Sequence, residues 1–161
     1  MSTDATARAF FAAPEFAVVG ASSDPTKFGH KIFQWYTHHK LPVTPINPSS
    51  STIKAFPPYP ALEIQSYPTL PNLSALPNPS STSVSIITPP KVTLKVLEEA
   101  KKLGVKGVWL QPGAFDDAVL KFAFAEFESA VAGDGGRGDE GWCVLVDGEK
   151  AAKAAGKSFK L

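Results

Sequence analysis

The chain has 161 residues, of which 43% are hydrophobic, and this size suits one globular domain with a sizeable core. The formal net charge is only +1, so no strong field attracts nucleic acid or an anionic membrane surface. A single cysteine excludes an internal disulfide, and no apolar run is long enough to span a membrane.

These limits predict a single domain over residues 1–161. The lone cysteine is typical of a reducing compartment, so we expect the protein in the cytoplasm. The start of the chain lacks the basic and apolar stretches of a secretory signal, and it gives only weak support to a mitochondrial presequence.

The first half of the chain alternates apolar segments with stretches of turn-forming residues. Its first segment is a continuous apolar run, which is typical of a parallel strand buried on both faces. Apolar residues at helical spacing follow, and clustered prolines then exclude a helix from the next long loop. The predicted elements are, in order, strand 15–20, helix 30–40, strand 41–47, the proline-rich loop 48–60 and a weak third strand 62–67.

The second half continues the alternation of strands and helices. A proline at position 90 is well placed to open a helix, and Gly104 is well placed to end it. The predicted elements are, in order, strand 83–88, helix 90–103, strand 106–110, helix 114–131, the flexible glycine-rich loop 133–141, strand 142–146 and a short terminal helix within 149–157.

This alternation predicts an α/β fold, a Rossmann-like doubly wound and mainly parallel sheet. Right-handed crossovers favour the strand order 3-2-1-4-5-6, with the weak third strand at one edge. Ligands of such sheets bind beyond the carboxyl ends of the strands, where the strand order reverses. Here that point lies between the strands 15–20 and 83–88.

The loop after the first strand has the features of a phosphate-binding loop. It precedes a helix, whose free amides favour an anion. Gly20 and Gly29 permit close approach of the backbone, while Ser22 offers a hydroxyl and Lys27 a cation. A plain turn without a ligand is the alternative, and the predicted fold favours phosphate binding over it.

The same loop departs from the NAD fingerprint. Its sequence GASSDP (20–25) breaks the Gly-x-Gly-x-x-Gly pattern, and the second strand ends in Asn47 rather than in an acidic residue. Both departures count against NAD. They fit a nucleotide whose ribose carries a phosphate, because a carboxylate would repel it, and NADP and coenzyme A both meet that description.

From Phe16 to Gly113 the chain carries, in order, the segments FAVVGASSDPTKFGHKI, PVTPINP, YPTL, SVSIITPP and VKGVWLQPG. Together they resemble the CoA-binding domain family, whose module is similar to the nucleotide-binding domain of the succinyl-CoA synthetase alpha subunit. The resemblance implies coenzyme A as the cofactor, with its diphosphate on the first loop, its adenosine part near the ends of the second and fourth strands, and its pantetheine beside the W-x-Q-x-G element. The implied cofactor-binding residues are Gly20, Ala21, Ser22, Lys27, Phe28, Gly29, Asn47, Pro48, Thr88, Pro89, Trp109, Gln111 and Gly113.

One departure from the family concerns cysteine. Many members carry a cysteine shortly after the Asp that follows the last strand. Here the segment 146–149, which includes Asp147, has no cysteine, and Cys143 falls inside the predicted strand. We therefore expect Cys143 to be a small buried apolar residue, and Trp109 and Trp142 to belong to the core.

The sequence contains no evident catalytic constellation. No His, Cys, Asp and Glu cluster has metal-ligand spacing, so we expect no metal, and no nucleophile, base and orienting group can be assembled. The favoured interpretation is a non-catalytic binding or regulatory module for coenzyme A or an acyl-CoA, with a homodimer or protein partner left open. The alternative is an NADP-dependent small oxidoreductase or another dinucleotide-binding protein.

Overall fold

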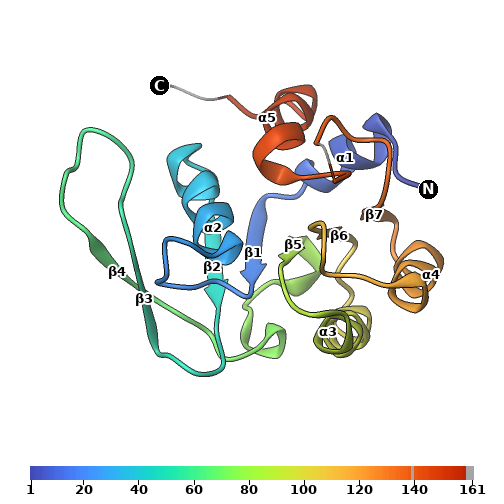
Figure 1. The fold of residues 1–161 in the computed structure, drawn as a ribbon, viewed down its shortest axis with the longest axis horizontal. Coiled ribbons are helices and arrows are strands. Elements are labelled where there is room, and N and C mark those ends of the chain that lie inside the picture. Colours follow the sequence, from blue (N-terminus) through green and yellow to red (C-terminus); the bar gives the residue numbers. More distant parts are fainter. Residues whose placement is uncertain (139, 159–161) are drawn as a thin grey trace.

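The computed structural model describes residues 1–138 and 140–158. Its centre is a five-stranded parallel sheet in the order β2-β1-β5-β6-β7, which confirms the α/β class and the Rossmann-like arrangement (Figure 1). The strands of this sheet are β1 Glu15–Val19, β2 Val43–Ile46, β5 Thr82–Ile86, β6 Gly107–Leu110 and β7 Ser129–Val131.

Helices cover both faces of the sheet (Figure 1). Buried side chains form two clusters, one beneath α1, α2 and α5 and the other beneath α3 and α4. This double cover explains the continuous apolar runs of the parallel strands, which have no solvent-facing side. The helices are α1 Asp4–Phe11, α2 Phe28–His38, α3 Pro90–Lys102, α4 Asp117–Glu126 and α5 Val144–Ala154.

The third predicted strand does not join this sheet. Residues Gln65–Pro68 (β4) pair antiparallel with Thr52–Ala55 (β3), and together they form the separate green hairpin in Figure 1. The proline-rich loop 48–60 therefore contains a strand, whose side chains alternate between exposed and buried. An isolated parallel bridge between Ile46 and Leu70 extends the main sheet beyond β2.

The predicted helix 114–131 is too long, because its end forms the edge strand β7. α4 ends at Glu126, and Ser129–Val131 pair in parallel with β6. The hydroxyl of Ser2 reinforces this edge, since its Oγ lies 2.7 Å from both the carbonyl oxygen and the amide nitrogen of Ala132. This contact joins residues 130 positions apart in the sequence, so no local pattern reveals it.

The prediction of a last strand at 142–146 is also wrong, because helix α5 begins at Val144. The Val144 amide donates to Oε1 of Gln111 at 2.9 Å, and the Cys143 amide donates to the Asp147 carboxylate at 2.9 Å. These acceptors satisfy amides at the start of a helix. A short apolar run does not by itself distinguish a buried strand from a buried helical turn. The terminal helix predicted within 149–157 is the second half of α5.

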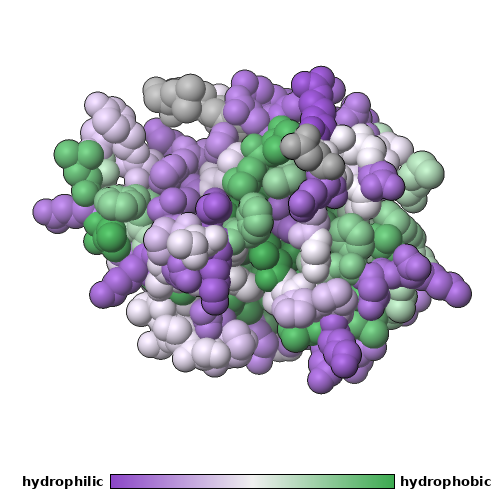
Figure 2. Space-filling view, viewed as in Figure 1, coloured by the Kyte–Doolittle hydropathy of each residue, from purple (hydrophilic) through white to green (hydrophobic). Residues whose placement is uncertain are grey.

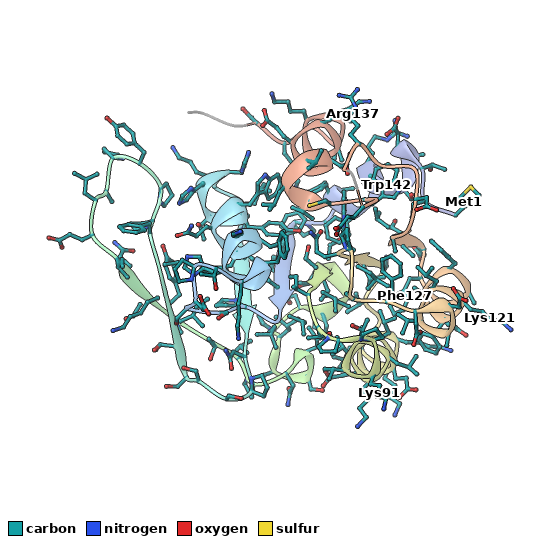
Figure 3. All side chains as sticks on the ribbon, viewed as in Figure 1. Met1, Lys91, Lys121, Phe127, Arg137 and Trp142 are labelled. Atoms are coloured by element: carbon teal, nitrogen blue, oxygen red, sulfur yellow. The ribbon has the colours of Figure 1, made fainter. Side chains whose placement is uncertain are left out.

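Helix α1 carries two aromatic residues that no sequence pattern assigned to the core. The ring of Phe11 lies 5.6 Å from that of Phe16 and 5.9 Å from that of Trp109, and the ring of Phe10 lies 5.5 Å from that of Trp109. Trp109 is fully buried, and Trp142, which points into the molecule in Figure 3, is 5% exposed. Both tryptophans therefore belong to the core, as predicted.

A buried hydroxyl pair on α2 and β5 gives the fold a defined pH dependence. Tyr36 is fully buried, its hydroxyl lies 2.7 Å from Oγ of Ser85, and burial raises the pKa of Tyr36 well above its usual value. The folded protein thus keeps this proton at pH values where the unfolded chain loses it. The resulting stabilisation is complete below about pH 10 and is lost as the pH rises further.

We expect Tyr36→Phe to lower the free energy of unfolding by about 1 kcal/mol at neutral pH, because Ser85 loses its partner. Between about pH 9 and 11 the variant should lose less stability than the wild type. Urea unfolding at both pH values measures this difference, with Tyr59→Phe as the control at a position that is 88% exposed. Parallel stability curves for Tyr36→Phe and the wild type would contradict the prediction.

Candidate functional site

The loop between β1 and α2 begins where the strand order reverses. From β1 the chain leads to β2 on one side of β1, and it later returns to β5 on the other side. Gly20, the first residue after β1, has a φ of 95°, and a Cβ there would lie 2.6 Å from the carbonyl oxygen of Ile87. A Cβ on Gly29 would lie 1.8 Å from the carbonyl oxygen of Gly20. Both glycines are thus required by contacts within the protein, and Gly29 lets α2 pack directly onto the end of β1.

The starts of α2 and α3 are suited to an anion. α2 begins after Lys27 and α3 begins after Pro89, and both lack a side-chain cap and an acidic residue in the first turn. By contrast, Thr3 caps α1 and Asp116 caps α4. The first amides of an uncapped helix are free for a phosphate, and α2 offers those of Phe28 and Gly29. α3 offers fewer, because Pro90 has no amide hydrogen and the amides of Val92 and Thr93 donate to the carbonyl oxygen of Pro89. The two uncapped starts lie after β1 and β5, the strands that flank the predicted ligand position.

The first loop is held in shape by its own side chains. The Asp24 carboxylate accepts hydrogen bonds from the hydroxyl of Thr26 at 2.7 Å and from its amide at 2.9 Å. These two bonds hold the pKa of Asp24 below its usual value, and the bond from the Thr26 hydroxyl has the larger effect. Behind the loop, Nδ1 of the buried His30 lies 2.9 Å from the carbonyl oxygen of Ser22. The loop is therefore preorganised before any ligand binds.

Asn47 connects the end of β2 to this loop. Its Nδ2 donates to the carbonyl oxygen of Ala21 at 3.1 Å, and its Oδ1 accepts from the amides of Ser49 and Ser50 at 2.8 and 3.0 Å. The residue that follows is Pro48. The end of β2 thus presents a neutral side chain where an NAD-binding sheet has a carboxylate.

On the other side of the reversal point, Gln111 connects the end of β6 to the start of α5. Gln111 is 3% exposed, its Nε2 donates to Sγ of Cys143 at 3.3 Å, and its Oε1 accepts from the Val144 amide. A pocket of about 300 Å³ lies beside these groups. Its walls include Phe28 of α2, Gln111 and Pro112 beyond β6, and Cys143 and Val146 at the start of α5.

The family model for the CoA binding domain matches residues 14–135. This chain belongs to the CoA-binding domain family. This membership supports a CoA-related binding role. The matched range includes the first loop, Asn47 and Gln111.

Solved structures show the same fold as this CoA-binding domain. A hypothetical protein from Pyrococcus horikoshii OT3 aligns with a TM-score of 0.71 at 23% identity, over 92% of each chain. A protein from Thermus thermophilus aligns with a TM-score of 0.69 at 23% identity, over 92% of this chain and 98% of its own. A conserved hypothetical protein from Pyrococcus furiosus aligns with a TM-score of 0.60 at 28% identity, over 72% of this chain and 90% of its own. A comparison with curated proteins gave no match.

The position of Cys143 in this CoA-binding domain corrects the sequence interpretation. Cys143 is half-buried at the start of α5 and lines the pocket, rather than lying inside a strand. The last strand is β7, the Asp that follows it is Asp134, and Cys143 comes after the glycine-rich loop.

Most of the predicted binding residues lie along the carboxyl edge of the CoA-binding domain's sheet, but Trp109 does not. Its side chain is fully buried against Phe10 and Phe11, so it supports the sheet and cannot flank a pantetheine. Gly113, with a φ of 90°, forms the turn beyond β6. The residues at the edge are Gly20, Ala21, Ser22, Lys27, Phe28, Gly29, Asn47, Pro48, Thr88, Pro89 and Gln111.

The pocket-lining roles of Pro112, Cys143 and Val146 were missed, because no local pattern joins the end of β6 to a helix so far along the chain. Across residues 1–138 and 140–158, no group of three or more His, Cys, Asp or Glu side chains could hold a metal ion. Over the same residues, no helix has both the length and the apolar character needed to cross a bilayer.

Proposed function

We propose that this protein binds coenzyme A or an acyl-CoA as a non-catalytic binding or regulatory module. The observation that carries this proposal is the shared edge of the sheet, where the uncapped start of α2 follows a loop that is hydrogen-bonded to the neutral side chain of Asn47, and the uncapped start of α3 follows the neighbouring strand β5. The family match names the ligand class that fits this arrangement.

Each part of coenzyme A has residues of suitable chemistry at this edge. The amides at the start of α2 and the ammonium of Lys27 would hold the diphosphate. Asn47 and Pro48 would face the adenosine part, where the absence of a carboxylate leaves room for the ribose phosphate. Thr88 and Pro89 would contact the nucleotide from β5, and Gln111 would lie beside the pantetheine arm.

The positions of the three histidines support a module without catalysis of its own. His30 braces the first loop, and His38 and His39 lie at the end of α2. The pocket beside Gln111 is lined by none of them. Transfer chemistry at the thiol end of coenzyme A would need a positioned base or acid there, and the ionisable side chains among the described lining residues are Glu140 and Cys143.

We expect purified protein to show only background thioesterase, ligase and reductase turnover. The measurement is a screen of these three activities with acyl-CoA and nicotinamide substrates. Turnover that disappears in Cys143→Ala, with coenzyme A binding intact, would overturn the non-catalytic proposal and name Cys143 as the catalytic residue.

Calorimetry with CoA, acetyl-CoA, NAD and NADP tests the ligand class. We expect CoA or acetyl-CoA to bind more tightly than either nicotinamide dinucleotide, because the end of β2 lacks the NAD carboxylate and the family match favours coenzyme A. NADP binding clearly tighter than CoA would replace the proposal with the oxidoreductase alternative.

Asn47→Asp tests where the ribose phosphate lies. A new carboxylate about 4 Å from that phosphate would weaken CoA binding about tenfold. The variant also loses the hydrogen bond from Asn47 to the carbonyl oxygen of Ala21, which affects both ligands equally. Dephospho-CoA lacks the repelled group, so its affinity should fall less than that of CoA. Asn72→Asp, which makes the same chemical change at the cap of a remote short helix, is the control. An unchanged ratio of CoA to dephospho-CoA affinity in Asn47→Asp would place the ribose phosphate elsewhere.

A further inference from the structure

The pocket beside Gln111 lies in line with the proposed nucleotide site. Asn47 follows β2, the first loop follows β1, Thr88 follows β5 and Gln111 follows β6, and these strands are neighbours in that order. At about 4.8 Å between strands, the row from β2 to β6 is about 14 Å long. A ligand that has its adenosine part at β2 and its diphosphate at β1 points its remaining arm toward this pocket.

The mouth of the pocket is apolar although it faces solvent. Phe28 is 55% exposed and Val146 is 51% exposed, and both line the pocket together with Pro112. Figure 2 shows apolar side chains over the start of α5 on this face of the molecule. Exposed apolar side chains around a concavity are typical of a ligand site.

The polar groups in the pocket are already engaged or carry the wrong charge for an anion. The Gln111 amide uses its oxygen on the Val144 amide and its nitrogen on Cys143. Glu140 lines the rim, while neither Lys nor Arg does so in the described residues. A second carboxylate, such as the free end of a dicarboxylic acyl group, would be repelled there.

We propose that this pocket receives the acyl group of a short-chain, uncharged acyl-CoA. The inference rests on the proposed function, because it takes the nucleotide of coenzyme A to lie along the same edge. The volume of about 300 Å³ is at the small end for ligand pockets, so it suits a few carbon atoms rather than a fatty acyl chain. Phe28 and Val146 select the acyl group by apolar contact, and Glu140 repels negatively charged acyl groups.

Calorimetry with CoA, acetyl-CoA, butyryl-CoA, hexanoyl-CoA and succinyl-CoA tests this assignment. Each methylene buried in the pocket should tighten binding about fourfold. Affinity should therefore rise from acetyl-CoA to butyryl-CoA, which has two more methylenes, by about fifteenfold and then level off as longer chains leave the pocket. Succinyl-CoA should bind at least about tenfold more weakly than butyryl-CoA.

Val146→Asp should remove the preference for butyryl-CoA, so that the ratio of butyryl-CoA to CoA affinity falls to about one. Leu145→Asp is the matched control, because Leu145 is a partly exposed apolar residue of the same helical turn that does not line the pocket. It should keep the wild-type ratio. Thermal melting confirms that both variants are folded.

The outcomes separate the two proposals. If no CoA species binds, the proposed function itself fails. If CoA binds but affinity is independent of chain length, the acyl pocket alone is wrong. Succinyl-CoA binding as tightly as butyryl-CoA, or a butyryl preference that persists in Val146→Asp, overturns the acyl assignment as well.

Discussion

Replacing Gly29 with alanine should lower the free energy of unfolding by at least about 2 kcal/mol. The added Cβ would lie 1.8 Å from the carbonyl oxygen of Gly20, so α2 and the end of β1 must move apart. Overpacking of this kind costs about 3 kcal/mol or more and exceeds the gain of about 1 kcal/mol from placing alanine in a helix. Urea unfolding measures the difference.

Gly156→Ala is the control, because Gly156 has a φ of 88° but no neighbouring atom lies within 4 Å of the place that a Cβ would take. It should show only the strain of a left-handed backbone, about 1 kcal/mol. Stability equal to the wild type in Gly29→Ala would contradict the packing of α2 on β1. A Cβ on Gly20 would likewise meet a backbone carbonyl, that of Ile87. Replacing either glycine with valine would therefore disturb folding as well as ligand binding.

Phe11→Ala should cost about 3–5 kcal/mol of stability. The Phe11 ring is fully buried and lies against Phe16 and Trp109, so its removal leaves a cavity between α1 and the sheet. Phe56→Ala is the matched control at a position that is 45% exposed, and it should change stability by no more than about 0.5 kcal/mol. Denaturant unfolding of both variants measures the contrast. Comparable losses in both would show that α1 does not anchor the core.

The two proposals assign different parts of one edge to different chemistry. The first loop, the starts of α2 and α3 and Asn47 are polar and suited to phosphates, whereas Phe28, Pro112 and Val146 form an apolar end. Coenzyme A has this same polarity along its length. A module that binds the nucleotide tightly and reads a short acyl group at the other end would report which acyl-CoA is present.

The sequence by itself determined the sheet's inner strands and the nature of the first loop. Residues 16–19 of β1 and all residues of β5 and β6 are buried, and this property is visible locally because nearly every residue of such a strand is apolar or small. The neutral residue Asn47 at the end of the second strand could likewise be read directly from the sequence. These features predicted the relative order of β2, β1, β5 and β6, which the structure confirms. The ligand position at their carboxyl ends stays a prediction.

Only the tertiary structure decided the edges of the sheet and the pocket. Apolar patterns report burial but not the partner that causes it, so Ser129–Val131 resembled the end of a helix and 142–146 resembled a strand. Ser2 from the start of the chain supports β7, and Gln111 supplies an acceptor at the start of α5. Hydrogen bonds and contacts between distant segments made these choices, and they also brought Cys143 and Val146 to the pocket beside Gln111.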